Sequence, residues 1–204
     1  METKNQTCTS SAPSECSGCD LGGKLKCQFN KTDLLKFIGT YLVFAIPSII
    51  GVILAGYGWF LLGWLIFYLI FFEVWEIRIL CSHCPYYAED DKTLHCIANY
   101  GIRKLWKYHP EPLSISEKVQ LIIGFVIFGG YPIIFIALGA QLFWLILSLI
   151  GLGFFFIRLN LTTCNKCVNF SCPLNRVKKI IKDEYLKKNP VMREAWEKTG
   201  YKIE

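Results

Sequence analysis

Basic residues are missing from two long stretches of this sequence. No Lys or Arg occurs from Phe37 to Ile77 or from Val119 to Ile157. A soluble helical hairpin would need a polar face at helical spacing, and none is present between Phe37 and Phe72. The chain also lacks a phosphate-binding glycine loop, a Ser/His/Asp set and paired carboxylates on a soluble domain. Nothing in it therefore predicts a hydrolase or a kinase.

The apolar residues are concentrated in the same two stretches. Of the 204 residues, 53% are hydrophobic, against about 45–50% in soluble domains, and the mean hydropathy is +0.36. A helix needs roughly 20 apolar residues to cross a membrane, and the blocks 34–80 and 119–159 are each about twice that length. We therefore predict an all-α integral membrane protein with four transmembrane helices in two hairpins, at 34–55, 59–80, 119–138 and 142–159.

The distribution of charge predicts the orientation of these helices. All 22 Lys and Arg residues lie on the side that holds both termini and the loop 81–118, and basic residues near span ends stay in the cytoplasm. We expect no signal peptide before the first span. We expect a multi-pass protein of the cell membrane with both termini cytoplasmic. We expect the basic residues that give the chain its net charge of +6 to contact membrane lipid. We do not expect them to bind nucleic acid.

Four glycosylation-type sequons leave the inverted orientation open. They begin at Asn5, Asn30, Asn160 and Asn169. In that orientation the Cys-rich face would lie outside the cell and form disulfides. Asn30 and Asn160 are close to predicted spans, where a glycan is poorly accommodated, so the charge distribution carries more weight.

All ten cysteines lie on the predicted cytoplasmic side. Because thiols are kept reduced there, metal binding is a better expectation than disulfide formation. Three Cys-x-x-Cys pairs occur, a spacing that lets a tight turn direct both thiolates at one metal. The candidate ligands form three groups: Cys8, Cys16, Cys19 and Cys27 in the N-terminal segment 1–33; Cys81, Cys84 and Cys96 in the loop 81–118; and Cys164, Cys167 and Cys172 in the C-terminal segment 160–204.

The second and third groups follow spans that run in the same direction, so they are expected to meet at one membrane face. They would form either two three-Cys sites, each completed by a ligand such as His83 or His95, or one shared four-Cys site. The first group can supply four ligands by itself. Its segment is so poor in apolar residues that metal binding would have to fold it.

The residues do not select one metal. The steps Cys84-Pro85 and Cys172-Pro173 are similar to the Cys-Pro step of ferredoxin-type motifs, which favours an iron–sulfur cluster and electron transfer at the cytoplasmic membrane face. Long-range Cys-x-x-Cys pairs suit zinc equally well, and would then stabilise a membrane scaffold or adaptor. A membrane thiol–disulfide oxidoreductase is the third interpretation. In each case a protein partner is expected at the cytoplasmic face.

One further candidate lies inside the second predicted span. Glu73 is about 12 Å from Cys81 along a helix that rises 1.5 Å per residue. A carboxylate at that depth indicates a functional site. We expect Glu73 to contact a cofactor or a lipid-soluble redox carrier, and the competing interpretation is a structural ion pair with an arginine.

Four stretches together carry a family resemblance: Cys81-Ser-His-Cys-Pro-Tyr-Tyr87, Leu94-His-Cys96, Gly101-Ile-Arg-Lys-Leu-Trp-Lys-Tyr108 and Cys164-Asn-Lys-Cys-Val-Asn-Phe-Ser-Cys-Pro-Leu-Asn175. Over roughly residues 75–175 the sequence resembles a group of four-span, Cys-rich membrane proteins of anaerobic prokaryotes. The resemblance implies a reducing, iron-rich cell. It brings no known activity with it.

Overall fold

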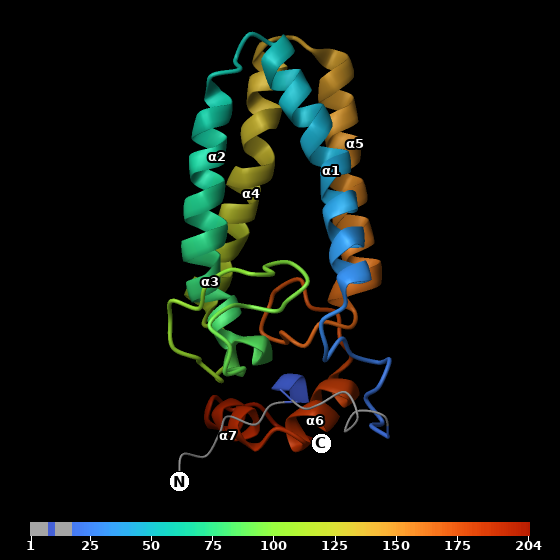
Figure 1. Cartoon of the computed structure of the whole chain (residues 1–204), viewed down its shortest axis with the longest axis vertical. Coiled ribbons are helices and arrows are strands. Elements are labelled where there is room, and N and C mark those ends of the chain that lie inside the picture. The colour runs from blue at the N-terminus through green and yellow to red at the C-terminus, as the bar shows by residue number, and fades with distance from the viewer. Residues whose placement is uncertain (1–7, 11–17) are drawn as a thin grey trace.

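The chain folds into four long helices above a small cap (Figure 1), as seen in a computed structural model that describes residues 8–10 and 18–204. Short helical turns extend two of the long helices towards the cap. The long elements are α1 (Lys31–Leu54), α2 (Phe60–Ile70) with the π-helical turn η2 (Phe71–Trp75) and α3 (Glu76–Ile79), α4 (Ile115–Leu138), and α5 (Leu142–Leu159) with the π-helical turn η5 (Asn160–Cys164).

Four stretches are long and apolar enough to cross a membrane: Lys31–Leu54, Phe60–His83, Ile115–Leu138 and Leu142–Cys164. The prediction of four such helices in an all-helical fold is confirmed, and it is consistent with a multi-pass membrane protein. Large apolar side chains such as Leu65, Ile66 and Ile122 are exposed on the outer faces. Helices that are apolar on every face are typical of a lipid environment.

The long helices form two close pairs. α1 lies along α5 and α2 lies along α4, and Figure 1 shows the pairs meeting at the end far from the cap and separating towards it. Gly151 of α5 makes the first contact possible, because a Cβ there would lie 2.5 Å from the Val43 carbonyl oxygen of α1. Small residues of this kind let membrane helices approach closely.

Helix termini on the cap side are fixed by local hydrogen bonds. Asn30 caps α1 by accepting from the Thr32 N–H at 2.8 Å. At the start of α4 the Ser114 hydroxyl accepts from the Glu117 N–H at 3.3 Å, while the Glu117 carboxylate accepts from the Ser114 N–H at 2.8 Å. This reciprocal capping box satisfies two backbone donors that a helix start otherwise leaves free.

The cap is built from three separate parts of the chain. It contains the short helices η1 (Cys8–Ser10), η3 (Cys81–His83) and η4 (Pro85–Ala88), and the C-terminal helices α6 (Lys179–Lys187) and α7 (Pro190–Lys198). Its apolar core joins N-terminal and C-terminal segments; fully buried members are Leu21, Val168, Tyr185, Leu186 and Met192. The cap closes the open end of the helical bundle.

Candidate metal centre

A cavity of about 460 Å³ lies where the helix pairs separate above the cap. Its upper wall is aromatic and comes from all four long helices, with Phe44 of α1, Phe72 of η2, Phe128 of α4 and Phe155 of α5 among the lining side chains. Its lower wall contains every cysteine of the second and third groups: Cys81, Cys84, Cys96, Cys164, Cys167 and Cys172. The two groups are therefore brought together at one site.

The second and fourth helices deliver their cysteines in a similar way. Each contains a π-helical turn near its Cys-x-x-Cys pair: η2 is followed by α3 and then by the first pair, whereas η5 ends at Cys164. At the first pair the Cys84 N–H donates to the Cys81 carbonyl at 2.9 Å, which closes a tight turn. Such wide helical turns are frequent at functional sites. The two hairpins thus present their cysteines to the same cavity by matching local geometry.

Asparagine side chains fasten the loops that carry these cysteines. Asn169 donates to the Leu80 carbonyl at 3.0 Å and so ties the third group to the end of the second helix. Asn175 donates to the carbonyls of Cys167 and Asn169 at 2.8 and 2.9 Å. Asn99 donates to the Cys81 sulfur at 3.1 Å and to the Glu76 carboxylate at 3.3 Å. The sulfur positions are held by buried amide groups rather than by apolar packing alone.

The surroundings of the cysteines disfavour uncompensated thiolates. Burial raises the pKa of Cys84 well above its ordinary value, and the neighbouring Cys167 raises it further. Burial also raises the pKa of Cys96 and brings the pKa of Cys167 and of Cys172 to about 12. None of the six cavity cysteines is in a disulfide. A bound cation would supply the positive charge that lets several such thiols ionise together.

The sulfur atoms are not drawn tightly together. In every trio of described cysteines at least one pair of sulfurs lies more than 4.8 Å apart, and within residues 8–10 and 18–204 the only three-residue group meeting that distance is Glu89, Asp91 and His95. This group lies on the cap surface, where the His95 Nδ1 is 3.5 Å from Glu89 and 3.3 Å from Asp91. The cysteines therefore surround a space rather than a point.

The two candidate histidines are engaged away from the sulfurs. His83 is buried, with its Nδ1 2.7 Å from the Glu111 carbonyl oxygen and its Nε2 3.5 Å from the Glu117 carboxylate. His95 faces the two cap carboxylates described above. Both ring nitrogens of His83 and the Nδ1 of His95 therefore contact oxygen atoms and not a cavity cysteine.

The carboxylate at the cavity is Glu76 and not Glu73. Glu76 is buried, at 5% exposed, and lines the cavity, whereas Glu73 is on the exposed side of the helix. Residues three apart share a face of a regular α-helix. The π-helical turn at Phe71–Trp75 contains more residues per turn than an α-helix, and this rotates the residues that follow it about the helix axis. The two glutamates therefore face different ways.

The described cysteines of the first group pack against the cap core and do not line the cavity. The Cys8 sulfur is 3.5 Å from the Asn189 side-chain amide, and the Cys19 sulfur is 3.6 Å from the Lys188 ammonium. Cys27 packs against the same core, and Cys16 lies outside the described residues. Tyr185 is a fully buried member of this core, and its hydroxyl has no hydrogen-bond partner in the described part of the chain.

One sequon is part of this site. Asn169 is 6% exposed and its amide is committed to the Leu80 carbonyl. A glycan on Asn169 is incompatible with this packing.

Comparison with family models, with curated proteins and with solved structures gives no match. The chemistry of the cavity, rather than a relative, carries the functional proposal.

Proposed function

We propose that this protein is a cell-membrane iron–sulfur protein that transfers electrons at the cytoplasmic face, with both termini in the cytoplasm. The observation that carries the proposal is the single cavity lined by six cysteines from the two hairpins. Three of these thiols are buried and three are partly buried, and none of the six is in a disulfide. Thiolate ligation of a metal centre accounts for them.

The steps Cys84-Pro85 and Cys172-Pro173 favour an iron–sulfur cluster over a single zinc ion, because they are similar to the Cys-Pro step of ferredoxin-type motifs. Four of the six cysteines would ligate the cluster, and two would remain as free thiols or hydrogen-bonding neighbours.

The chain's own residues prepare the site for electron transfer. When bound, the cluster would supply a one-electron redox couple. Asn99 directs an N–H at the Cys81 sulfur, and hydrogen bonds to cluster sulfurs tune the reduction potential. Burial of Cys81, Cys84 and Cys164 keeps water from that side of the centre. The amide ties of Asn169 and Asn175 hold both ligand loops at fixed positions.

Two electron partners complete the proposal. A reduced soluble electron-transfer protein docks at the cap and delivers one electron at a time. The aromatic upper cavity takes the ring of a lipid-soluble quinone, which accepts two electrons in succession and two protons to become a quinol. Glu76 is the carboxylate on that wall, and it passes protons from the cap towards the quinone oxygen.

Anaerobic purification in detergent, followed by metal analysis and a visible spectrum, tests the metal. A brown protein with iron and acid-labile sulfide is the expected result. A colourless protein with stoichiometric zinc would overturn the redox proposal in favour of a scaffold or adaptor. Metal-free protein whose Cys-x-x-Cys pairs react with a membrane-impermeant thiol reagent from outside the cell would instead identify a thiol–disulfide oxidoreductase.

A further inference from the structure

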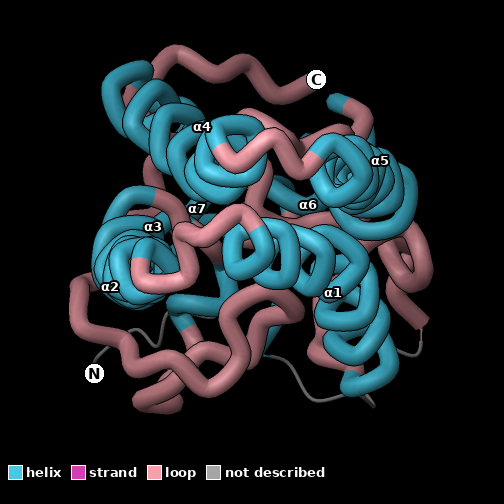
Figure 2. Tube along the Cα trace, turned by 90° about the horizontal axis from the view of Figure 1, so that it is seen from above, coloured by secondary structure: helices cyan, strands magenta, loops and turns pink. Residues whose placement is uncertain are grey.

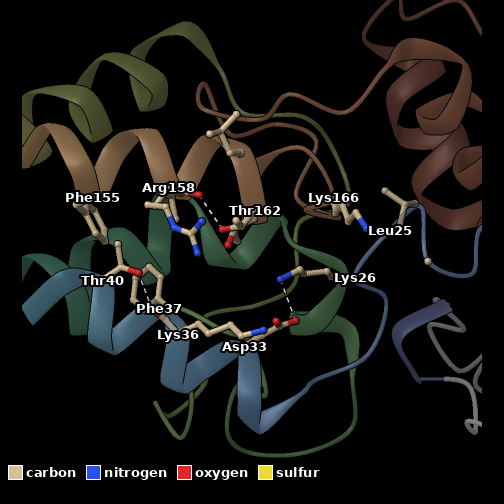
Figure 3. Close-up of a pocket in the computed structure, with 14 residues that line it drawn as sticks. Leu25, Lys26, Asp33, Lys36, Phe37, Thr40, Phe155, Arg158, Thr162 and Lys166 are labelled. Carbon is tan, nitrogen blue, oxygen red and sulfur yellow. Dashed lines mark hydrogen bonds and ion pairs between the residues drawn. The ribbon is translucent and has the colours of Figure 1, made fainter.

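A second pocket, of about 540 Å³, lies between the beginning of α1 and the end of α5. Figure 3 shows Asp33, Lys36 and Phe37 on α1 facing Arg158 and Thr162 on α5 and its extension, with Lys26 and Lys166 on the side towards the cap. Four of the lining residues are basic and one is acidic. The pocket is thus strongly positive, in contrast to the cysteine cavity.

Only one of the four cations is neutralised nearby. The Lys26 ammonium lies 2.9 Å from the Asp33 carboxylate. Lys36, Arg158 and Lys166 form no ion pair in the described part of the chain, so three positive charges remain uncompensated. Three uncompensated cations at one pocket repel one another, and an anionic ligand would relieve that repulsion.

The hydroxyl groups of the pocket are oriented by the helices. Thr40 donates to the Lys36 carbonyl at 2.7 Å, and Thr162 donates to the Arg158 carbonyl at 2.7 Å. These two protons are therefore used within each helix, and the charged donors available to a ligand are the Lys and Arg nitrogens, beside the hydroxyl of Thr163. Nitrogen donors with positive charge suit phosphate oxygens, and the planar Arg group can bind two of them at once.

The pocket also lies at the boundary of the apolar segments. Lys36 immediately precedes the stretch without basic residues that begins at Phe37, and Arg158 immediately follows the stretch that ends at Ile157. Phe37, Phe155 and Leu159 line the side of the pocket that continues along the apolar helices. Charged nitrogens below and apolar side chains above match the order of groups in a phospholipid.

We propose that this pocket binds the phosphate headgroup of an anionic phospholipid, with Lys36, Arg158 and Lys166 contacting the phosphate and the acyl chains following α1 and α5. Basic pockets between helices at the cytoplasmic face select such headgroups. The inference rests on the proposed membrane insertion and orientation, but it does not depend on the metal centre. The function of the pocket is to retain a specific lipid at the contact between α1 and α5.

The test compares nanodiscs of phosphatidylcholine alone with nanodiscs that also contain phosphatidylglycerol. Native mass spectrometry after release from the disc counts each lipid that stays bound. Wild-type protein should retain phosphatidylglycerol preferentially. Because each basic residue near such a surface contributes about fivefold, Arg158→Gln should weaken the preference about fivefold and Lys36→Gln with Arg158→Gln roughly 25-fold. Arg158→Lys should retain most of the preference, which separates loss of charge from misfolding.

The matched control is Lys198→Gln, which removes one positive charge from an exposed position at the end of α7. It should leave lipid preference unchanged. An equal loss in this control, an absence of preference in wild-type protein, or retention of inorganic phosphate without lipid selectivity would each overturn the site. A chain that stays in the aqueous phase would overturn the membrane proposal together with the site, whereas an inserted chain without preference overturns the site alone.

Discussion

The side-chain amide of Asn99 donates to the sulfur of Cys81 at 3.1 Å. The same nitrogen lies 3.3 Å from the Glu76 carboxylate, so one buried amide joins a cavity cysteine to the carboxylate of the upper cavity. A hydrogen bond to a ligand sulfur stabilises the more negative, reduced state of a cluster. The reduction potential of the proposed centre should therefore depend on the hydrogen bond from Asn99 to Cys81.

Replacing this amide should lower the reduction potential. In Asn99→Leu the N–H···S bond is lost, and a loss of about 1 kcal/mol corresponds to roughly 40 mV for one electron. Redox titration followed by electron paramagnetic resonance measures the shift. Gln141→Leu is the control, because Gln141 lies between α4 and α5 at the end far from the cap, where its amide donates to the Leu54 carbonyl. An unchanged potential in Asn99→Leu would mean that Cys81 does not ligate the cluster.

Cysteines of both hairpins should be needed for the same centre. Changes beside a metal ligand already weaken metal binding about 10–100-fold, so loss of a ligand should lower bound iron at least as much. We expect Cys84→Ser and Cys167→Ser each to abolish the same visible absorbance. Cys19→Ser, outside the cavity lining, should leave that absorbance in place. Loss of only half of the signal in each cavity variant would indicate two separate three-Cys sites.

The α1–α5 contact should not tolerate a methyl group at Gly151. A Cβ there would lie 2.5 Å from the Val43 carbonyl oxygen and 2.9 Å from the Phe44 Cα. Since both neighbours are backbone atoms, Gly151→Ala should push the helices apart and destabilise the protein by about 1–3 kcal/mol. Thermal unfolding in detergent measures the change. Gly153→Ala, with nothing within 4 Å of the added Cβ, should unfold at the wild-type temperature or above.

Stability of the cap should depend on pH through Asp183. Burial alone would raise the pKa of Asp183, but hydrogen bonds from Lys179 and Tyr201, both at 2.7 Å, outweigh burial and hold it below the usual range. A carboxylate with a lowered pKa stabilises the fold above its unfolded pKa of about 3.9. This stabilisation is lost as the pH falls through the folded pKa.

Asp183→Asn should therefore destabilise the cap by about 1–3 kcal/mol at neutral pH. The difference from wild type should close as the pH falls below about 4. Thermal unfolding at several pH values, followed by the fluorescence of Trp196 in α7 with the other tryptophans replaced by Phe, reports on the cap. Glu194→Gln serves as the control, because Glu194 is exposed on α7. A difference that persists undiminished at pH 3 would show that charge at Asp183 is not the cause.

Quinone reduction should depend on Glu76 and not on Glu73. Removing a proton-transfer group slows a reaction on the order of 10²-fold, so Glu76→Gln should slow reoxidation of the reduced protein by a soluble quinone analogue to that extent. Glu73→Gln changes the same functional group on the exposed side of the helix and should have no effect. Stopped-flow absorbance records both rates. Equal rates in the two variants would remove Glu76 from the mechanism.

Composition and charge were sufficient to predict the four apolar helices, because gaps in Lys and Arg mark them directly. Chain direction alone predicted that the second and third cysteine groups face one side. The contacts that define the site were not predictable. Asn169 bonds to Leu80 across 89 positions of sequence, and such a contact depends on the path of two loops. Glu73 was selected for its depth in the predicted span, and no residue pattern marks the π-helical turn at 71–75 that precedes Glu76.

The division of the cavity wall between the hairpins has a consequence for biosynthesis. Cys81, Cys84 and Cys96 are translated with the first hairpin, whereas Cys164, Cys167 and Cys172 follow the last long helix. A nascent chain that has not reached α5 holds only three of the six sulfur donors. The proposed centre can therefore assemble only after both hairpins have been made and brought together.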